Sequence, residues 1–409
     1  MPEDKKNKQP VTKTAGKGGQ AAGRQAKSGQ TKSGTPKAGR GKSGKSAAAA
    51  AKGGRAAAGG KNAAKTAGKK AGRKAAATPK SRRGLVIALI IFVLIAAVIG
   101  NFVSGIWYHV DDRKITGANA DWMAKIGDGQ KLSSFTIPGT HDSGTCFIFP
   151  AYFLQDQNND ISRQLMMGYR YLDIRVKLSK DGNGLELCHS FGRCRTGQMA
   201  GTDTLTFDDV VRDTQAFLAE HPAETVIFCI KAEKDTDSVS RIQKLVMSAV
   251  GREREKWYTG SRIPALGEVR GKIVLARRFE NVLGIDEAEA GLFFDWEDQG
   301  SAEVLADAAA AVPLDGDGEL IVQDRYHYNT EDKWKAVTDL MNSGRAGEDA
   351  LVLNFFSASY GKLPHPLSYA KKMNARFLAA CGDLPADNYG ILIFDFASED
   401  LASAVIGLN

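Results

Sequence analysis

Eight short apolar or β-branched runs between residues 135 and 394 constrain the fold of this chain more than any other feature. Runs of this length fit buried strands, and their alternation with helical patterns predicts a parallel α/β sheet. Eight strands favour a distorted (β/α)8 TIM-type barrel over a doubly wound open sheet, because no Gly-rich phosphate loop follows any run. The runs cover 135–137, 171–176, 185–188, 225–230, 272–276, 320–322, 351–355 and 390–394.

The segments between several of these runs carry apolar residues at helical spacing. A spacing of three to four residues places apolar side chains on one face of a helix, as expected for helices that cover a sheet. The predicted helices cover 207–220, 237–250, 334–342 and 367–381, and a shorter one covers 121–126.

Residues 1–83 cannot contribute to such a domain. They contain 23 basic and 2 acidic residues, a net charge of +21, and no Leu, Ile, Phe, Tyr or Trp. So little apolar surface cannot offset the entropy lost on ordering, so we expect a disordered Lys/Ala/Gly-rich tail. Residues 84–409 carry a net charge of −13, so the overall value of +8 describes neither part.

The uncharged run over 84–106 predicts a single transmembrane helix, because about 20 apolar residues in a helix span the bilayer core. Arg82 and Arg83 precede it, and Trp107 and Tyr108 follow it, which fits the positive-inside rule with an aromatic anchor. We therefore expect a cell-membrane protein with a cytoplasmic tail and an extracellular catalytic domain over 121–409, joined by a linker over 107–120. A cleaved secretory signal is the alternative, although the run is long for one.

The charge of the tail predicts an anionic partner. The inner membrane leaflet is one candidate, since each basic residue near an anionic surface contributes about 1 kcal/mol. Nucleic acid bound through its phosphates is another, and a solvated arm that only enforces topology is a third. No feature of the sequence indicates an obligate protein partner. Among the five cysteines, Cys188 and Cys194 bracket a short loop, and either a disulfide or two free thiols fits that spacing.

Polar and charged residues follow or end each of the eight runs. In a parallel barrel these ends meet at one rim, where such enzymes carry their chemistry. The set contains two histidines, several carboxylates and a surplus of fixed positive charge, which suits phosphoryl transfer without a metal. The residues are His141, Asp142, Asp173, Arg175, His189, Lys231, Glu233, Arg277, Arg278, Gln323, Asp324, Tyr326, Asn354, Ser357 and Asp395.

The motifs around these residues resemble the bacterial phosphatidylinositol-specific phospholipase C family, an X-domain-like phosphodiesterase barrel. The resemblance rests on FTIPGTHDSGT, YRYLDIRV, LCHS, GKIVLARRF, VQDRY and LNFFSAS, in the order of the family. It extends from about residue 122 to residue 396 and does not include the tail or the apolar run. It implies cleavage of phosphatidylinositol, or of a glycosylated inositol lipid, to diacylglycerol and inositol 1,2-cyclic phosphate.

The resemblance also implies roles at the matching positions. His141 would be the general base for the inositol 2-hydroxyl, oriented by Asp395 and supported by Asp142. Arg175 would bind a non-bridging phosphate oxygen. His189 would protonate the leaving oxygen and would be held by Asp173. The implied inositol-binding set is Lys231, Asp324, Tyr326 and one of Arg277 and Arg278.

No cofactor or metal is expected, because Arg175 stands where calcium-dependent relatives supply oxygen ligands to the ion. Two other functions remain open on sequence grounds. One is a metal-dependent glycerophosphodiesterase-like barrel, and the other is an inactive barrel that binds inositol lipids. Only one of Arg277 and Arg278 can face the site, because side chains alternate along a strand, and we favour Arg278.

Overall fold

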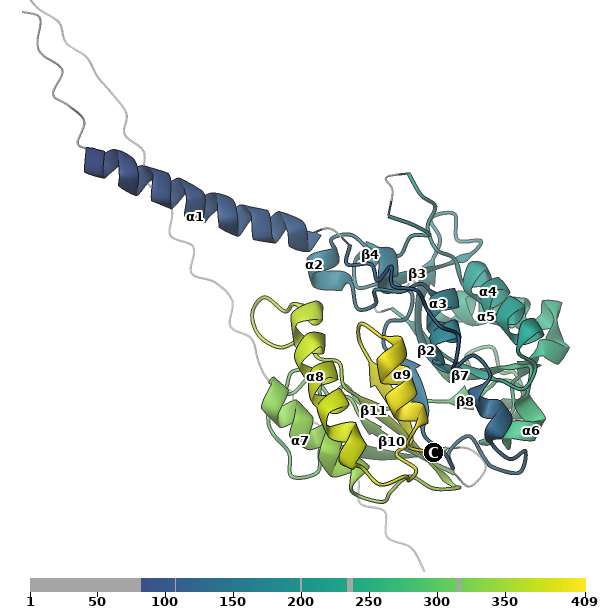
Figure 1. Cartoon of the computed structure of the whole chain (residues 1–409). Helices are drawn as coiled ribbons and strands as arrows, with labels where there is room; N and C mark the ends of the chain where they lie inside the picture. The colour runs from purple at the N-terminus through teal and green to yellow at the C-terminus, as the bar shows by residue number, and fades with distance from the viewer. Residues whose placement is uncertain (1–81, 107, 199–200, 234–237, 315–317) are drawn as a thin grey trace, which may run out of the picture. The chain divides into compact units, whose positions relative to one another are not determined.

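The computed structural model describes residues 82–106, 108–198, 201–233, 238–314 and 318–409 (Figure 1). The tail expected over 1–83 lies outside the described residues except for its last two, and the aromatic residue expected at 107 lies outside them as well. Within the helix that begins at residue 82, the side chains of 82, 83, 97 and 100–106 are also outside the description.

The described residues form α-helices, short 3-10 helices and strands in alternation. The α-helices are α1 (Arg82–Ile106), α2 (Ala151–Leu154), α3 (Ile161–Met167), α4 (Phe207–Glu220), α5 (Val239–Arg252), α6 (Leu266–Val269), α7 (Thr330–Met341), α8 (Pro366–Ala380) and α9 (Glu399–Ile406). The 3-10 helices are η1 (Trp122–Lys125), η2 (Thr145–Phe147), η3 (Arg254–Lys256), η4 (Glu287–Glu289) and η5 (Cys381–Asp383). The strands are β1 (Ile137–Thr140), β2 (Tyr171–Leu178), β3 (Leu185–His189), β4 (Gly192–Arg193), β5 (Val226–Ala232), β6 (Trp257–Tyr258), β7 (Ile273–Arg278), β8 (Leu292–Phe293), β9 (Ala310–Leu314), β10 (Gly318–Gln323), β11 (Ala350–Phe355) and β12 (Ile391–Phe394).

The strands form a curled sheet that corresponds to a distorted barrel. Its main path runs β6-β7-β5-β2-β1-β12-β11-β10-β9, and every pair from β6 to β10 is parallel. Only the last pair on this path, between β10 and β9, is antiparallel. Each predicted run overlaps an observed strand, although the run 135–137 shares only Ile137 with β1, which continues to Thr140, and the barrel class is confirmed in this distorted form.

The third predicted run does not take a place in the barrel wall. Strand β3 pairs antiparallel with β2, and β4 pairs antiparallel with β3. The connection from residue 179 to 184 reads SKDGNG, and its Asp-Gly and Asn-Gly pairs are the residues that favour a hairpin turn. The hairpin extends β2 beyond the barrel and brings the end of β3 back over the rim.

A side chain bridges the two ends of the curled sheet. No strand pairing joins β8 to β10 within the described residues. Instead, Gln299 donates from Nε2 to the Val322 carbonyl at 3.1 Å and accepts from the Asp324 amide at 2.8 Å. Because Gln299 is 2 % exposed, these two hydrogen bonds, which take the place of strand pairing, are shielded from water.

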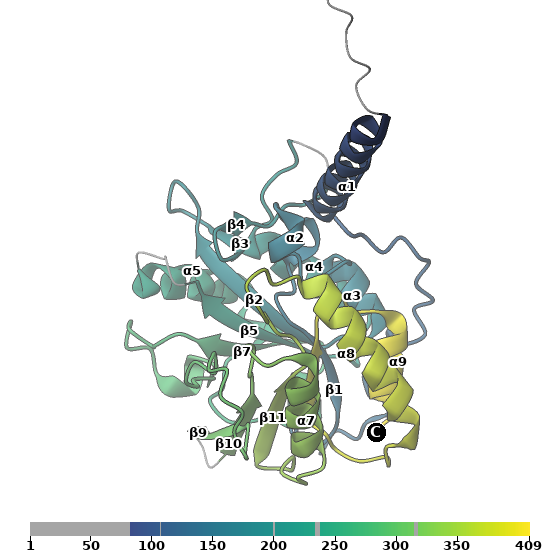
Figure 2. The same ribbon diagram turned by 90° about the vertical axis from the view of Figure 1, so that its left-hand side faces the viewer.

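The strands are buried on both faces, as a barrel wall requires. In β12, Ile391 and Ile393 pack in the central cluster with residues of the other wall strands. The alternate residues, Leu392 and Phe394, pack outward against α7, α8 and α9. Along the other half of the sheet, α3, α4 and α5 likewise pack against the outer faces of β2, β5 and β7 (Figure 2).

Helix α4 shows how local sequence fixes one of these covering elements. Thr206 caps the helix by accepting a hydrogen bond from the Asp209 amide, and Asp209 accepts one from the Thr206 amide in return. Such a reciprocal capping box satisfies two amides that a helix start leaves without partners. Val210, Thr214 and Phe217 then share the buried face, so the helix matches the predicted range 207–220.

The apolar run over 84–106 is helical, as predicted, and forms most of α1. No helix in the described part of the chain is both long enough and apolar enough to cross a membrane. The transmembrane helix expected here is therefore not confirmed, and several of the side chains concerned lie outside the description.

A buried ion pair joins the N-terminal side of the barrel to the segment before it. Arg170 Nε donates to Glu224 at 2.8 Å, and both side chains are completely buried. The same guanidinium donates to the carbonyls of Leu165, Tyr169 and Ala120, while Glu224 accepts from the Met123 amide. The pair therefore ties β2 and β5 to α3 and to residues 120–123.

Replacing Arg170 by Met should destabilise the domain by about 3–5 kcal/mol, because it leaves the Glu224 carboxylate buried without its cation. Urea unfolding followed by circular dichroism measures the change. The control is Arg252→Met, whose pair with Asp208 is exposed and should contribute less than about 1 kcal/mol. A similar small loss for both variants would contradict this role of the buried pair.

Candidate active site

A cavity of about 420 Å³ opens at the C-terminal ends of the parallel strands. It is lined by eight of the eleven residues to which the resemblance gives roles, whereas Asp142 and Asp173 lie against its polar wall and Arg277 faces elsewhere. The eight lining residues are His141, Arg175, His189, Lys231, Arg278, Asp324, Tyr326 and Asp395.

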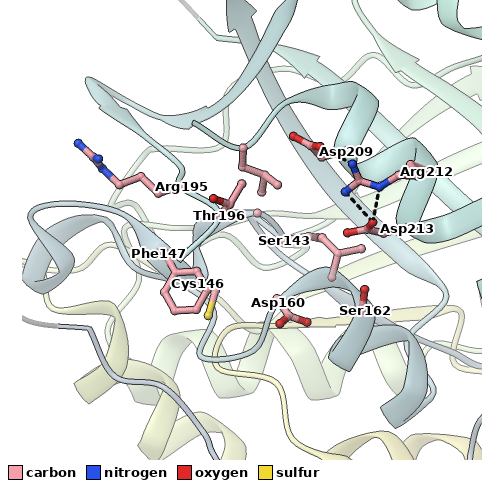
Figure 3. A pocket seen from close by; sticks show the side chains of 13 residues that line it. Ser143, Cys146, Phe147, Asp160, Ser162, Arg195, Thr196, Asp209, Arg212 and Asp213 are labelled. Carbon is pink, nitrogen blue, oxygen red and sulfur yellow. Dashed lines mark hydrogen bonds and ion pairs between the residues drawn. The ribbon is translucent and has the colours of Figure 1, made fainter. Parts of the chain in front are cut away.

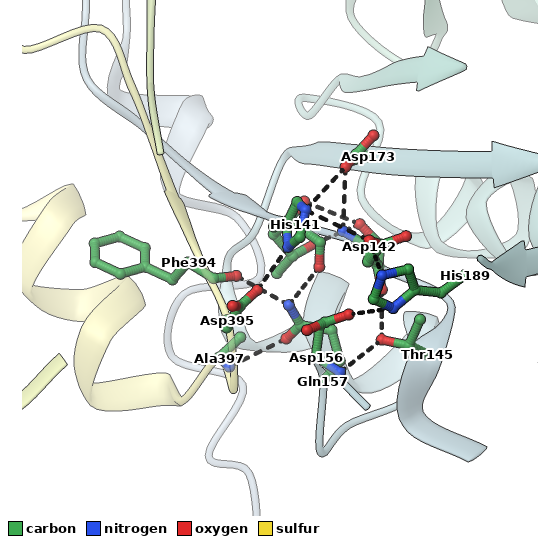
Figure 4. Close-up of polar contacts among 12 residues, drawn as sticks. His141, Asp142, Thr145, Asp156, Gln157, Asp173, His189, Phe394, Asp395 and Ala397 are labelled. Atoms are coloured by element: carbon green, nitrogen blue, oxygen red, sulfur yellow. Dashed lines mark hydrogen bonds and ion pairs between the residues drawn. The ribbon is translucent and has the colours of Figure 1, made fainter. Parts of the chain in front are cut away.

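His141 lies where β1 meets β12. The His141 amide donates to the Phe394 carbonyl at 3.1 Å, which continues the parallel ladder by one bond. This register brings Asp395, the residue after β12, to the imidazole, and Nδ1 lies 2.8 Å from Asp395 Oδ1 (Figure 4). The expected pairing of His141 with Asp395 is therefore present in the geometry.

Arg175 lies at the centre of the polar cluster. Its Nη2 is 2.7 Å from His141 Nε2, and its Nη1 is 3.0 Å from Asp142 Oδ2. A guanidinium has only donors, so this contact requires an unprotonated Nε2 on His141. The proton of the imidazole then lies on Nδ1, directed at Asp395. That tautomer leaves Nε2 as the basic nitrogen at the cavity.

His189 reaches the same cluster from the end of the β2–β3 hairpin. Its Nδ1 lies 2.8 Å from Asp156 Oδ2 and 3.0 Å from the Leu154 carbonyl, and its Nε2 lies 3.7 Å from Asp142 Oδ2. The expected contact with Asp173 is wrong. Asp173 lies instead 3.4 Å from Arg175 and 3.9 Å from His141, because β2 directs residues 173 and 175 to the same face.

Three strand ends that carry these groups have a residue with positive φ. Asp142, Ser190 and Phe396 follow His141, His189 and Asp395, with φ of 42°, 52° and 50°. For residues other than glycine this left-handed conformation is uncommon and costs about 1–3 kcal/mol when the surroundings enforce it. The chain turns away at these points, so the preceding side chain stays at the rim.

The carboxylates set the protonation of both imidazoles. Burial lowers the pKa of His141, but Asp395 and Asp142 outweigh burial and raise it to about 9. Burial likewise lowers the pKa of His189, and Asp142 and Asp156 raise it to about 10. Burial raises the pKa of Asp173, but Arg175 outweighs burial and lowers it to about 2. These carboxylates favour the protonated form of each imidazole, whereas Arg175 at Nε2 opposes protonation of His141 and keeps that nitrogen available as a base.

Four of the predicted sugar-binding residues, Lys231, Arg278, Asp324 and Tyr326, line the same cavity as the two histidines. Arg278 lines it and stacks on Trp296, with the guanidinium carbon 3.4 Å from the ring centre. Arg277 is buried and contacts Glu287 and the Phe279 carbonyl, so it does not face the cavity. Alternation along β7 thus places Arg278 in the position that we favoured.

Sequence reasoning missed Asp156, Trp296 and Asp298. Trp296 and Asp298 follow β8, whose run GLFF precedes polar residues just as the recognised strands do, so the same rule could have found them. Asp298 accepts from the Tyr326 hydroxyl at 2.5 Å. Asp156 follows a short helix rather than a strand, so no rule based on strand ends could have identified it.

Groups of potential metal ligands among the described residues all fall within this polar cluster. They are His141 with Asp142 and Asp173, His141 with Asp156 and Asp395, and His189 with Asp142 and Asp156. The guanidinium of Arg175 contacts every member of the first group. Its fixed charge occupies the place that a cation would take there, so the residues of the first group fit a guanidinium rather than a metal.

A second cavity of about 230 Å³ borders the loop after His141 (Figure 3). Ser143 and Cys146 line it on one side, and Arg212 lines it on the other. Arg212 is already paired with Asp209 at 2.8 Å and Asp213 at 2.9 Å. None of the predicted site residues lines this cavity, so the larger one is the candidate site. Cys188 and Cys194 are both buried free thiols, so the possible disulfide does not form.

Comparison with known proteins gives a family match over part of the domain and longer matches to individual relatives. Residues 135–279 match the family described as "Phosphatidylinositol-specific phospholipase C, X domain". The chain is 27 % identical over 330 residues to 1-phosphatidylinositol phosphodiesterase of Staphylococcus aureus (strain Newman), covering 74 % of this chain and 99 % of that protein. It is 25 % identical over 307 residues to the Listeria monocytogenes protein of the same name, covering 70 % and 84 %.

Solved structures give the same picture for the fold. A phosphatidylinositol-specific phospholipase C of S. aureus superimposes with a TM-score of 0.60 at 24 % identity, covering 73 % of this chain and 99 % of that structure. The phosphatidylinositol-specific phospholipase C of Listeria monocytogenes gives a TM-score of 0.57 at 23 % identity, covering 71 % and 98 %. The distorted barrel is therefore shared with both.

Proposed function

Since the chain belongs to the bacterial phosphatidylinositol-specific phospholipase C family, as its motifs predicted, we propose that it cleaves an inositol phospholipid within the cavity described above. The bond cleaved is the phosphodiester of phosphatidylinositol or of a glycosylated inositol lipid. The products are diacylglycerol and inositol 1,2-cyclic phosphate. The observation that carries the proposal is the meeting of two histidines on either side of Arg175 in one cavity.

The first step uses His141 as general base. Nε2 takes the proton of the inositol 2-hydroxyl, and the oxygen attacks the phosphorus to form the cyclic ester. Asp395, 2.8 Å from Nδ1, orients the ring and stabilises the imidazolium that forms. In the free protein Arg175 Nη2 lies 2.7 Å from Nε2, so the inositol 2-hydroxyl must replace this one contact while the guanidinium stays paired with Asp142 and Asp173.

Arg175 stabilises the charge that develops on phosphorus. Its side chain is 14 % exposed and is held by Asp142 and Asp173, so its position is fixed before the substrate arrives. A preorganised cation in a largely dry site stabilises a non-bridging oxygen without reorganisation during the reaction. This is the role that a divalent ion would otherwise supply, and it supports catalysis without a metal.

The second proton transfer uses His189 as general acid. Its Nε2 donates a proton to the diacylglycerol oxygen as the bond from phosphorus to that oxygen breaks. Asp142 lies 3.4 Å from His141 Nε2 and 3.7 Å from His189 Nε2, so it supports both imidazoles. Lys231, Arg278, Asp324 and Tyr326 supply the polar groups for the inositol hydroxyls, which disfavour analogues that lack one.

Phosphorus NMR of the product tests the mechanism directly. We expect cyclic inositol phosphate from phosphatidylinositol at an equal rate with and without EDTA. His141→Ala and His189→Ala should each lower turnover by about 10²–10⁴-fold, as loss of a positioned acid or base does. The control is His221→Ala, since His221 lies at the far end of α4 and pairs with Asp121.

Loss of activity in EDTA, reversed by calcium, would support the metal-dependent phosphodiesterase instead. Binding of inositol lipid without turnover would support the inactive barrel. Near-normal turnover of either histidine variant would refute the assigned roles.

Exposed apolar side chains at the rim support contact of the domain with the bilayer. Phe191 and Leu363 are 70 % and 74 % exposed, and they lie in loops that follow β3 and β11 beside the cavity. Phe149 and Tyr360 are also exposed in rim loops. A lipid substrate must enter the cavity from the membrane, and these side chains can insert at its surface.

Phe191→Ser combined with Leu363→Ser should weaken vesicle binding roughly tenfold or more, because each large apolar side chain contributes about 1.5–3 kcal/mol when fully buried. Turnover of a monomeric short-chain phosphatidylinositol should stay unchanged. Sedimentation with phosphatidylinositol vesicles measures binding. Leu378→Ser, an exposed leucine near the end of α8, is the control. An equal loss of turnover on the monomeric substrate would show that Phe191 and Leu363 act within the cavity and not at the membrane surface.

We further propose that α1 holds the chain at a cell membrane, with the tail in the cytoplasm and the domain outside. The described large side chains of α1 are apolar and exposed, as in Leu85 at 66 % and Phe92 at 68 %. The basic residues lie before the apolar run 84–106, which supports this orientation by the positive-inside rule. The tail would then meet anionic lipid or nucleic acid.

Protease added to intact cells should therefore digest the domain after residue 111 and spare residues 1–83. Immunoblots with antibodies against the tail and against the domain read out the two parts. Detergent-lysed cells are the control, in which both should be digested. Digestion of the tail with protection of the domain would reverse the orientation and contradict an extracellular lipase.

A further inference from the structure

His189 has a buried carboxylate partner to which the mechanism above gives no role. Asp156 Oδ2 lies 2.8 Å from His189 Nδ1, and the Asp156 side chain is 3 % exposed. Among the described residues, no other ion pair involves Asp156. The hydrogen bond of Nδ1 is to the Leu154 carbonyl at 3.0 Å, and Asp156 Oδ2 lies beside the same nitrogen as its ion-pair partner. The imidazole is thus held by Nδ1, and Nε2 is left for the cavity that His189 lines.

The backbone around Asp156 is tied to both ends of the reaction site. The Asp156 amide donates to Thr145 Oγ1 at 3.0 Å, and its carbonyl accepts from the Phe396 amide at 2.6 Å. Gln157 donates to the carbonyls of His141 and Phe394 at 2.7 and 2.9 Å (Figure 4). The carboxylate therefore lies on a segment fixed to the loop after β1 and to the end of β12.

We propose that Asp156 is the positioning residue of His189, which fixes its Nδ1–H tautomer and stabilises the imidazolium that delivers the proton to the leaving oxygen. The inference rests on the proposed function, in which His189 is the general acid. It makes the site a double arrangement, in which His141 has Asp395 at 2.8 Å and His189 has Asp156 at 2.8 Å.

Asp142 cannot supply this function alone. It lies 3.7 Å from Nε2, the nitrogen that must face the substrate, and its Oδ2 is engaged by Arg175 at 3.0 Å. The charged groups around His189 are therefore Asp142 from the loop after β1, Asp156 from the segment after α2, and Arg175 from β2. Asp142 and Asp156 raise the pKa of His189 against burial, and Arg175 lowers it.

Asp156→Asn tests the proposal, with Asp395→Asn as its matched control, since each removes one buried carboxylate from one histidine. Each variant is assayed on phosphatidylinositol, whose alkoxide leaving group needs protonation, and on an inositol phosphodiester with a nitrophenol leaving group, which does not. Asp156→Asn should lower turnover of the lipid about 10²-fold and turnover of the nitrophenyl ester only a few-fold. Asp395→Asn should lower turnover of both substrates, because both need His141 as the general base.

The pH profiles of kcat/KM give a second readout. The alkaline limb reports loss of the proton of His189, and the acid limb reports gain of a proton by His141. Removing the Asp156 carboxylate lowers the pKa of His189, so the alkaline limb should move to lower pH and the acid limb should stay. Removing the Asp395 carboxylate should instead move the acid limb to lower pH.

Equal losses of Asp156→Asn on both substrates, or an unmoved alkaline limb, would overturn the proposal. If this variant does not fold, nitrogen NMR of the wild-type imidazole decides. Nδ1 of His189 should stay protonated, and Nε2 should lose its proton with a pKa above that of free imidazole. Loss of the proton from Nδ1 instead would overturn the proposal. If the wild type turns over neither substrate, the proposed function fails, yet the NMR result still decides whether His189 carries the Nδ1–H tautomer that the role of Asp156 requires.

Discussion

The parallel pairing of β1 between β12 and β2 is the constraint on which the site depends. It joins the first and last strands of the barrel wall, so that Asp395 meets His141 across 254 positions of sequence. Gly139 makes this approach possible. A Cβ there would lie 3.0 Å from the Tyr171 ring and 3.1 Å from Ile391 and Ile393, so a larger residue would push the three strands apart. Packing in the barrel interior thus fixes the distance between a base and its carboxylate.

The energetic character of the rim differs from that of the rest of the domain. Below it, strands are apolar on both faces, and a buried ion pair such as Arg170–Glu224 connects elements. At the rim, His141, His189 and Arg175 face buried carboxylates, and non-glycine residues take left-handed backbone conformations. Buried charges and strained backbone both oppose folding. Their concentration where the strands end is what a preorganised reaction site requires, and the apolar barrel below supplies the stability that offsets them.

Sequence periodicity was sufficient for the strands, for α4 and for the choice of Arg278, because these depend on short-range alternation and on burial. It was not sufficient for contacts set by the path of a loop. Asp156 meets His189 only because segment 155–157 is hydrogen-bonded to two strand ends remote in sequence. Asp173 was assigned to the wrong histidine for a related reason. The antiparallel course of β3 brings His189 in beside Asp156 and Asp142, whereas Asp173 stays on β2 beside Arg175. The Asp-Gly and Asn-Gly pairs of residues 179–184 indicate a hairpin, but they do not indicate which carboxylates the end of β3 will contact.

The double arrangement of imidazole and carboxylate also explains why the reaction can proceed in a buried site. In the proposed reaction, His141 gains a proton from the inositol hydroxyl while His189 gives one to the leaving oxygen. The net charge of the two imidazoles therefore does not change, and the change at each ring is opposed by its own carboxylate, Asp395 or Asp156. Asp142, 3.4 Å from one Nε2 and 3.7 Å from the other, interacts with both rings throughout. Because the total charge near Arg175 stays constant, the surrounding dipoles need little rearrangement as the phosphorus changes partners.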